Sequence, residues 1–210
     1  MRYAKIHSLD ISNGEGVGVA IFVQGCHFHC LGCFNPETWD FNGGKEWNDK
    51  IEQKFISLIS KPYIKRVSIL GGEPLADENV EFTLHIMSLV GEICEQYNRE
   101  IMVWIYTGYT FEDVCDLKNK QNNDPLNLVL DWVDGKTSET FDEVTTKAAD
   151  KVLRNEILKY CDYLVDGRFE IDKQDLTYSK VKFAGSTNQR IIDIQKTLEK
   201  GEIVLYEQNS

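Results

Sequence analysis

The sequence has no block of lysine and arginine, and its formal net charge is −11. It therefore has no basic patch of the kind that binds a nucleic acid. Its longest apolar runs, such as residues 18–23, are far too short to cross a bilayer. The N-terminus lacks the apolar stretch of a secretory signal. We therefore expect a cytoplasmic protein that has neither nucleic acid nor a membrane as a partner.

Common catalytic motifs are also absent. The sequence contains no Walker-type phosphate loop, no Gly-x-Gly-x-x-Gly fingerprint, no Gly-x-Ser-x-Gly elbow and no His-Glu-x-x-His helix. Because no acid–base constellation is recognisable, any demanding chemistry must come from a cofactor that the protein positions. The 210 residues show no internal repeat and no linker, so we expect a single domain over residues 1–210.

Three of the six cysteines lie close together, in the run Gly25-Cys-His-Phe-His-Cys-Leu-Gly-Cys33. Three thiolates on one short loop can hold three corners of a cubane iron–sulfur cluster, whereas an electron-transfer cluster normally has four protein ligands. The iron without a cysteine is then open to a small molecule. The spacing therefore predicts a catalytic cluster held by Cys26, Cys30 and Cys33.

A zinc site with His27 or His29 as fourth ligand is the alternative. Zinc sites usually pair two ligand clusters that are well separated in sequence, and His7 and His85 are isolated. The iron–sulfur interpretation is therefore favoured, with His27 and His29 near the cluster or at the surface. The remaining cysteines are expected to be small, partly buried apolar residues: Cys94, Cys115 and Cys161.

The hydrophobic pattern alternates between short β-branched runs and helical spacing, which is typical of an α/β domain with a mostly parallel sheet. Strands are predicted at residues 18–23, 66–70, 101–106 and 163–166, and short ones at 191–194 and 203–206. Helices are predicted at residues 48–60, 77–97 and 141–158. Residues 118–124 are predicted to form a loop, 128–133 a strand or a helix start, and 172–188 irregular structure.

Loops after the strands of such a sheet carry the chemistry. The cysteine loop, the turn Gly71-Gly72-Glu73-Pro74 and the turn Tyr106-Thr107-Gly108-Tyr109 each follow a predicted strand, so we expect them to meet at one rim. Glycines let the backbone approach a ligand closely. Glu73 or exposed backbone carbonyls can receive an ammonium group, so an amino acid-like ligand would suit this rim.

These residues resemble those of the radical S-adenosylmethionine (SAM) superfamily, and within it the branch that activates anaerobic ribonucleotide reductases, which are glycyl-radical enzymes. The superfamily triad alone is moderately specific, whereas the ordered set of motifs is highly specific. The matching segments are Asp10-Ile-x-Asn-Gly-x-Gly16, Phe22-Val-x-Gly-Cys26, Gly32-Cys-Phe-Asn35, Thr38-Trp39, Gly71-Gly-Glu-Pro-Leu75, Trp104-Ile-Tyr-Thr-Gly-Tyr109, Leu164-Val-Asp-Gly-Arg-Phe169 and Gly185-Ser-x-Asn-Gln-Arg190.

The resemblance implies an open, partial βα barrel. It also implies a [4Fe–4S] cluster on the three clustered cysteines, whose fourth iron chelates SAM. One electron would cleave SAM to methionine and a 5′-deoxyadenosyl radical, which takes a hydrogen atom from a glycine Cα of the reductase. Reduced flavodoxin or ferredoxin would donate the electron, and no catalytic residue beyond the cluster ligands is required. The implied cofactor contacts are Gly32, Cys33, Phe34, Gly71, Gly72, Glu73 and Thr107.

Three departures from the superfamily pattern are visible. Gly32 replaces the aromatic residue that many members carry before the third cysteine, as in the reductase-activating branch. Ala184 stands where that branch tends to have arginine, and residues around 118–156 resemble an insertion. Two other functions stay open: the same chemistry on another glycyl-radical enzyme or on a small molecule such as a deazapurine precursor, and a non-catalytic metal or electron-transfer module. The segments 166–169 and 185–190 favour the reductase, and the missing fourth cysteine argues against the module.

Overall fold

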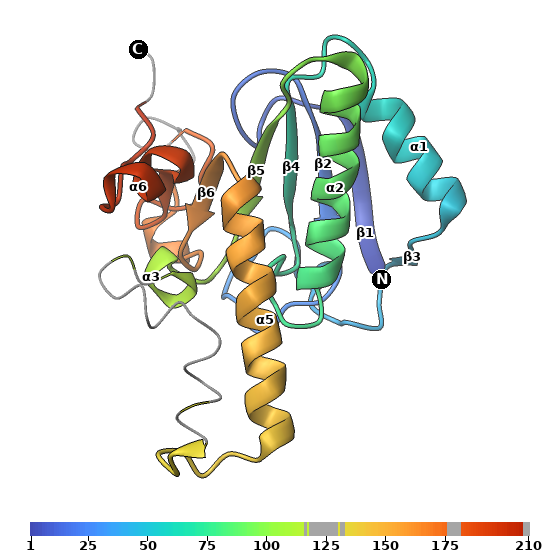
Figure 1. The fold of residues 1–210 in the computed structure, drawn as a ribbon. Helices are drawn as coiled ribbons and strands as arrows, with labels where there is room; N and C mark the ends of the chain where they lie inside the picture. Colours follow the sequence, from blue (N-terminus) through green and yellow to red (C-terminus); the bar gives the residue numbers. More distant parts are fainter. Residues whose placement is uncertain (116, 118–129, 131–132, 176–181, 208–210) are drawn as a thin grey trace.

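A sheet of seven strands forms the centre of the computed structural model, which describes residues 1–115, 117, 130, 133–175 and 182–207 (Figure 1). The strand order is β3-β1-β2-β4-β5-β6-β7. The central strands run parallel: β2 (Gly18–Val23), β4 (Arg66–Gly71), β5 (Met102–Tyr106) and β6 (Tyr163–Asp166). Antiparallel strands complete the two sides: β1 (Arg2–Asp10), β3 (Lys45–Glu46) and β7 (Arg190–Asp193). Within the described residues the outer strands β3 and β7 do not pair, so the sheet is open.

The predicted α/β class is confirmed, and so are the strands at residues 18–23, 66–70, 101–106 and 163–166. β2 is buried along its whole length. A parallel strand that is covered on both faces has a continuous apolar sequence, and this pattern allowed β2 to be predicted. β1 was not predicted, because most of its side chains are partly or fully exposed and no apolar run marks it.

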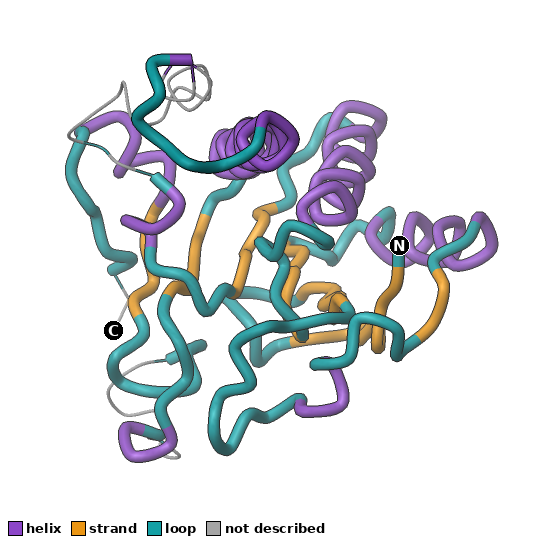
Figure 2. Tube along the Cα trace, turned by 90° about the horizontal axis from the view of Figure 1, so that it is seen from below, coloured by secondary structure: helices purple, strands orange, loops and turns teal. Residues whose placement is uncertain are grey.

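The three long helices lie along one side of the sheet, and loops cover the other side (Figure 2). These helices are α1 (Asp49–Ile59), α2 (Val80–Tyr97) and α5 (Phe141–Tyr160). Phe55 of α1, Ile86 of α2 and Ile157 of α5 are fully buried in the main hydrophobic core. Short helices complete the described elements: η1 (Pro36–Thr38), α3 (Phe111–Val114), η2 (Ile171–Lys173) and α6 (Ile194–Lys200). None of the helices in the described part of the chain is long and apolar enough to cross a membrane.

The helix predictions are confirmed for residues 48–60 and 141–158, and α2 begins three residues later than predicted, at Val80. The strand predicted at 191–194 is β7, from which the chain turns directly into α6. The strand predicted at 203–206 is wrong: this segment contributes a single bridge, Leu205 with Ile192. The predicted loop at 118–124 and most of the segment 128–133 lie outside the described residues.

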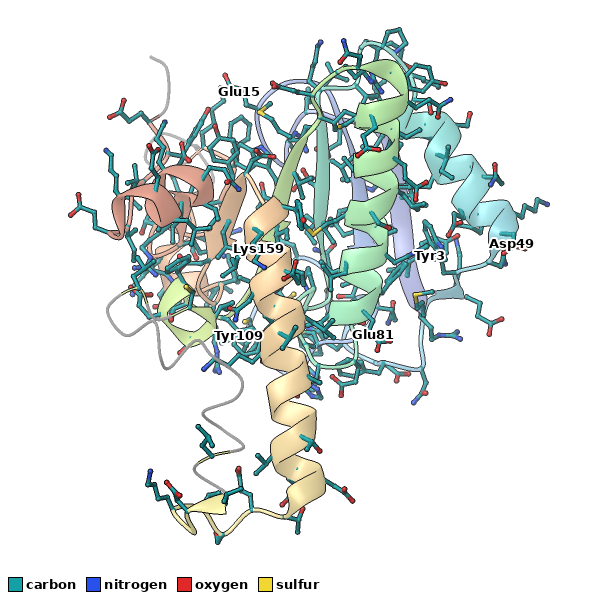
Figure 3. The ribbon with its side chains drawn as sticks, in the orientation of Figure 1. Tyr3, Glu15, Asp49, Glu81, Tyr109 and Lys159 are labelled. Atoms are coloured by element: carbon teal, nitrogen blue, oxygen red, sulfur yellow. The ribbon has the colours of Figure 1, made fainter. Side chains whose placement is uncertain are left out.

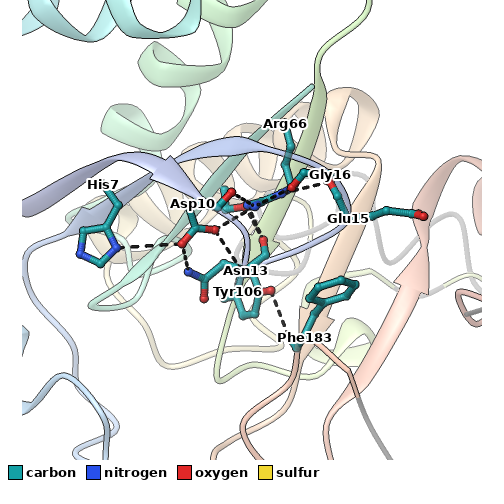
Figure 4. A network of polar contacts seen from close by, with 9 residues as sticks. His7, Asp10, Asn13, Glu15, Gly16, Arg66, Tyr106 and Phe183 are labelled. Carbon is teal, nitrogen blue, oxygen red and sulfur yellow. Dashed lines mark hydrogen bonds and ion pairs between the residues drawn. The ribbon is translucent and has the colours of Figure 1, made fainter. Parts of the chain in front are cut away.

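A buried ion pair fixes the loop between β1 and β2 (Figure 4). Arg66, at the start of β4, is 0% exposed, and one of its amino groups lies 2.8 Å from the carboxylate of Asp10. The guanidinium also donates to the carbonyls of Asp10 and Asn13, at 2.9 and 2.6 Å. Gly14 has a φ of +124°, and a Cβ there would lie 2.6 Å from the Arg66 side chain. The turn around Gly14 is therefore closely packed.

Candidate active site

The three loops predicted to meet are joined by hydrogen bonds at the carboxyl ends of β2, β4 and β5. The amide of Glu73 donates to the carbonyl of Gly25, at 2.8 Å, which links the Gly-Gly-Glu-Pro turn to the residue before Cys26. The Asn79 side chain bridges the carbonyls of Gly25 and Glu73, at 3.2 and 2.9 Å. A Cβ on Gly72 would lie 2.3 Å from the Gly25 carbonyl oxygen, so this close approach requires glycine.

The buried carboxylate of Glu73 connects the loop after β4 with the loop after β5. One oxygen accepts from the Leu75 amide at 2.9 Å and from the Thr107 hydroxyl at 2.7 Å. The other oxygen accepts from the Gly108 amide at 2.7 Å. Burial raises the pKa of Glu73 to about 7, while these donors and the positive charge of Arg154 act in the opposite direction. The carboxylate thus holds the two loops together.

The cysteine loop is held at both of its ends. The amides of Gly25 and Cys26 donate to the carbonyls of Thr38 and Trp39, at 2.7 and 3.0 Å. The Cys33 amide donates to the Cys30 carbonyl at 3.1 Å. This closes a tight turn between the second and third thiols. The backbone therefore brings all three cysteines to the same side of the loop, where they border one cavity.

Nearly all of the site residues predicted from the sequence line one cavity of about 390 Å³. Gly32 is the exception, because it does not line the cavity and instead lies close to Ile171. The predicted residues that line it are Cys26, Cys30, Cys33, Phe34, Gly71, Gly72, Glu73 and Thr107. Its chemistry suits a ligand with both polar and apolar parts, because thiols and main-chain groups face aromatic rings.

The three thiols fit an iron–sulfur cluster better than a single ion. Among the described residues no three His, Cys, Asp or Glu side chains are grouped to hold one metal ion. In a cubane each thiolate binds a different iron, so its ligands need not converge on one point. Burial raises the pKa of the Cys26 and Cys30 thiols. Because metal binding requires thiolates, a cluster held by these thiols would displace their protons.

The histidines of the cysteine loop point elsewhere. The Nε2 of His27 lies 2.9 Å from a carboxylate oxygen of Glu78, and the His29 ring packs on Trp39 at a centroid distance of 4.7 Å. Neither histidine lines the cavity. Both histidines are exposed. Cys115 and Cys161 are buried and Cys94 is partly buried, as expected for cysteines outside the site.

Several residues beside the three thiols were not predicted as site residues. The ring of Phe28, between the first two cysteines, packs on Tyr109 at a centroid distance of 4.8 Å, and the Arg168 guanidinium lies over it at 4.4 Å. Phe169 packs on Phe34 at 4.9 Å. Arg168 and Phe169 fall in a segment that carried the family resemblance, but their contacts depend on chain segments far apart in sequence.

Comparisons with known proteins agree with these observations. Residues 12–150 and 137–192 match the family model of a 4Fe-4S single cluster domain. An anaerobic ribonucleoside-triphosphate reductase-activating protein of Pasteurella multocida is 31% identical over 193 residues, which cover 91% of this chain and 96% of that protein. The protein of the same name from Enterobacteria phage T4 is 30% identical over 191 residues, covering 91% and 93%. The Escherichia coli K12 protein is 31% identical over 138 residues, covering 65% and 84%.

The two longer matches include most of both chains. They agree with the ordered motifs and with a cavity that brings those motifs together. The chain belongs to the family of anaerobic ribonucleoside-triphosphate reductase-activating proteins.

Proposed function

We propose that this chain is a radical SAM enzyme that generates a glycyl radical on the anaerobic ribonucleoside-triphosphate reductase. One observation carries the proposal: the three clustered thiols share a cavity with the Gly71-Gly72-Glu73 turn and Thr107. The matched iron–sulfur domain supports the cluster, and the names of the relatives support the reductase as partner. We also propose that residues 1–210 form one domain, an open barrel of the radical SAM type with an insertion around residues 118–156.

In this proposal Cys26, Cys30 and Cys33 would hold a [4Fe–4S] cluster, and SAM would bind at the iron that has no cysteine ligand. Such a cluster, reduced by flavodoxin or ferredoxin, would supply the electron for the cleavage of SAM to methionine and a 5′-deoxyadenosyl radical, and that radical would take a hydrogen atom from a glycine Cα. The protein contributes no acid or base to this scheme. Its residues position the ligand and exclude water and oxidants.

The hydrogen bonds of Glu73 assign its side chain a supporting role in this scheme. Both of its oxygens already accept from the neighbouring loops. We therefore propose that the main chain of the Gly71-Gly72-Glu73 turn meets the methionine end of SAM, while the carboxylate shapes that turn. The backbone around Phe34, which lines the cavity, is the proposed neighbour of the adenine, whereas Gly32 lies outside the cavity.

Anaerobic reconstitution tests the proposal. The protein is loaded with iron and sulfide, reduced, and mixed with SAM with and without candidate reductases. We expect 5′-deoxyadenosine to form, and a glycyl-radical EPR doublet to appear only with the anaerobic ribonucleotide reductase. Cys30→Ala should abolish both signals in a folded chain. Cys161→Ala is the matched control, because this buried thiol lies outside the cavity and its loss should leave both signals.

Other outcomes would assign another function. Stoichiometric zinc in oxygen-free material contradicts the proposal and favours a non-catalytic metal site. A cubane with four protein ligands and no cleavage of SAM contradicts it as well and favours an electron-transfer module. Cleavage of SAM with a radical on a different glycyl-radical protein keeps the chemistry and replaces the partner.

A further inference from the structure

Arg154 connects helix α5 with the two loops that Glu73 holds together. Its Nε donates to the Leu75 carbonyl at 3.0 Å, and its guanidinium forms an ion pair with Asp77. Leu75 directly follows the Gly-Gly-Glu-Pro turn, and Asp77 lies two residues further along the chain. The same guanidinium lies over the Tyr109 ring, 5.5 Å from its centroid, where the loop after β5 passes α5 (Figure 3). One side chain therefore contacts both loops.

These contacts extend indirectly to the cysteine loop. Tyr109 packs edge-on against Phe28, which lies between Cys26 and Cys30. Arg154, Tyr109 and Phe28 also line a groove of about 890 Å³ beside the ligand cavity, and Phe28 borders both spaces. Arg154 itself does not line the ligand cavity. Its effect on a ligand there must therefore pass through the loops that it contacts.

The contact to the Leu75 carbonyl is the strongest of the three. The Arg154 side chain is 22% exposed, whereas that of Asp77 is 61% exposed, so the ion pair is well solvated and contributes little. A charged donor on a half-buried carbonyl forms a charge-assisted hydrogen bond, which is about twice as strong as a neutral one. The positive charge also acts on the buried Glu73 carboxylate and lowers its pKa.

We propose that Arg154 is a positioning residue for SAM binding, which fixes the turn at residues 71–75 and Tyr109 so that the cavity is formed before the ligand arrives. This inference rests on the proposed function. It gives a role to part of the segment 118–156, to which the family resemblance assigned none. Preorganisation of this kind lowers the ordering cost of binding and so appears as affinity.

The test compares Arg154→Met with Arg99→Met. Arg99 makes similar contacts away from the cavity: it donates to the carbonyls of Ile59 and Lys61 and lies over the Tyr97 ring. The dissociation constant of SAM is measured by equilibrium dialysis on reconstituted protein of known iron content. We expect Arg154→Met to weaken SAM binding about tenfold, the effect of one charge-assisted hydrogen bond, and Arg99→Met to leave it unchanged. Arg154→Lys, which keeps the charge, should recover part of the affinity.

Amide hydrogen exchange of the cluster-free protein gives a second readout. The amides of Gly72, Glu73 and Leu75, in the turn at residues 71–75, all donate hydrogen bonds. Their exchange should accelerate in Arg154→Met and not in Arg99→Met. Equal SAM affinity in Arg154→Met and the wild type overturns the inference, and so does an equal loss in Arg99→Met.

Two controls keep the result interpretable. If Arg154→Met does not fold, Arg154→Gln replaces it, because it removes the charge on the contact to the Leu75 carbonyl and keeps a polar side chain. Weaker SAM binding in this variant supports the inference, and unchanged binding overturns it. A wild-type protein that carries the cluster and binds no SAM contradicts the proposed function itself, which is a separate result from the behaviour of the variants.

Discussion

The hydroxyl of Thr107 donates a 2.7 Å hydrogen bond to the carboxylate of Glu73, across 34 positions of the sequence. Both residues are buried. The same hydroxyl oxygen accepts from the Tyr109 amide at 3.1 Å, so it orders its own turn while it holds the neighbouring one. The rim of the cavity therefore depends on side chains that fix backbone turns.

Thr107→Val should destabilise the protein, because it keeps the shape of the side chain and removes one donor from a buried carboxylate. We expect the free energy of unfolding to fall by about 1–3 kcal/mol. The measurement is urea unfolding of the cluster-free protein. Ser88→Ala removes an exposed hydroxyl on α2 and should change the value by less than about 0.5 kcal/mol. A loss no larger than that of the control would count against the bond.

The stability of the protein should depend on the ionisation of Glu73. Burial raises the pKa of this carboxyl from 4.5 to about 7 in the folded protein. The folded state then holds the proton more tightly than the unfolded chain, so this contribution is largest below pH 4.5 and is lost as the pH rises to about 7.

Glu73→Gln isolates this effect, because the other titrating groups are the same in both proteins. Relative to this variant, the wild type should lose about 3 kcal/mol of unfolding free energy between pH 4.5 and pH 7. The difference should be constant above pH 8. Urea unfolding at a series of pH values measures it, and a difference that does not vary with pH would refute the prediction.

Gly72→Ala should disrupt the junction of two loops. The added Cβ would lie 2.3 Å from the carbonyl oxygen of Gly25, a backbone atom that cannot rotate away. We expect about 1–3 kcal/mol of destabilisation and a lower iron content after reconstitution. Gly91→Ala is the matched control: Gly91 lies in α2 with nothing within 4 Å, so alanine should stabilise the helix by about 1 kcal/mol. Thermal unfolding and iron analysis of both variants check the pair.

Arg66→Met should be among the most destabilising substitutions outside the hydrophobic core. It leaves the carboxylate of Asp10 buried without its partner, which costs about 3–5 kcal/mol. Adding Asp10→Asn should restore part of that loss, because no unpaired charge remains. Lys173→Met breaks an exposed ion pair with Glu170 and should cost at most about 1 kcal/mol. Comparable losses in Arg66→Met and Lys173→Met would show that the buried pair is unimportant.

The three cysteines at the cavity and the Gly-Gly-Glu-Pro turn could be predicted because each belongs to a contiguous motif. The sheet topology could be predicted from local patterns, because β2 and β4 are continuous buried runs. Parallel strands then place the loops that follow them at one rim. The convergence of three loops on one cavity followed from that arrangement.

The supporting contacts could not be predicted, because their partners lie far apart in the chain. Arg154 is 79 positions from Leu75, and a single arginine in a polar helix is normally a solvated residue. Asn79 near the start of α2 looks like an ordinary helix cap, yet its side chain bonds two loop carbonyls instead. β1 carries only two buried residues, Tyr3 and Asp10, so it left no hydrophobic pattern.

The walls of the cavity come from both halves of the chain: Lys5 and His7 from β1, and Gly185 and Gln189 from the approach to β7. During synthesis the cysteine loop leaves the ribosome long before residue 185 exists. The thiols are thus made before the enclosure that protects them. A chain cut short ahead of residue 185 would lack Gly185 and Gln189, so its three thiols would border a cavity with part of its wall missing.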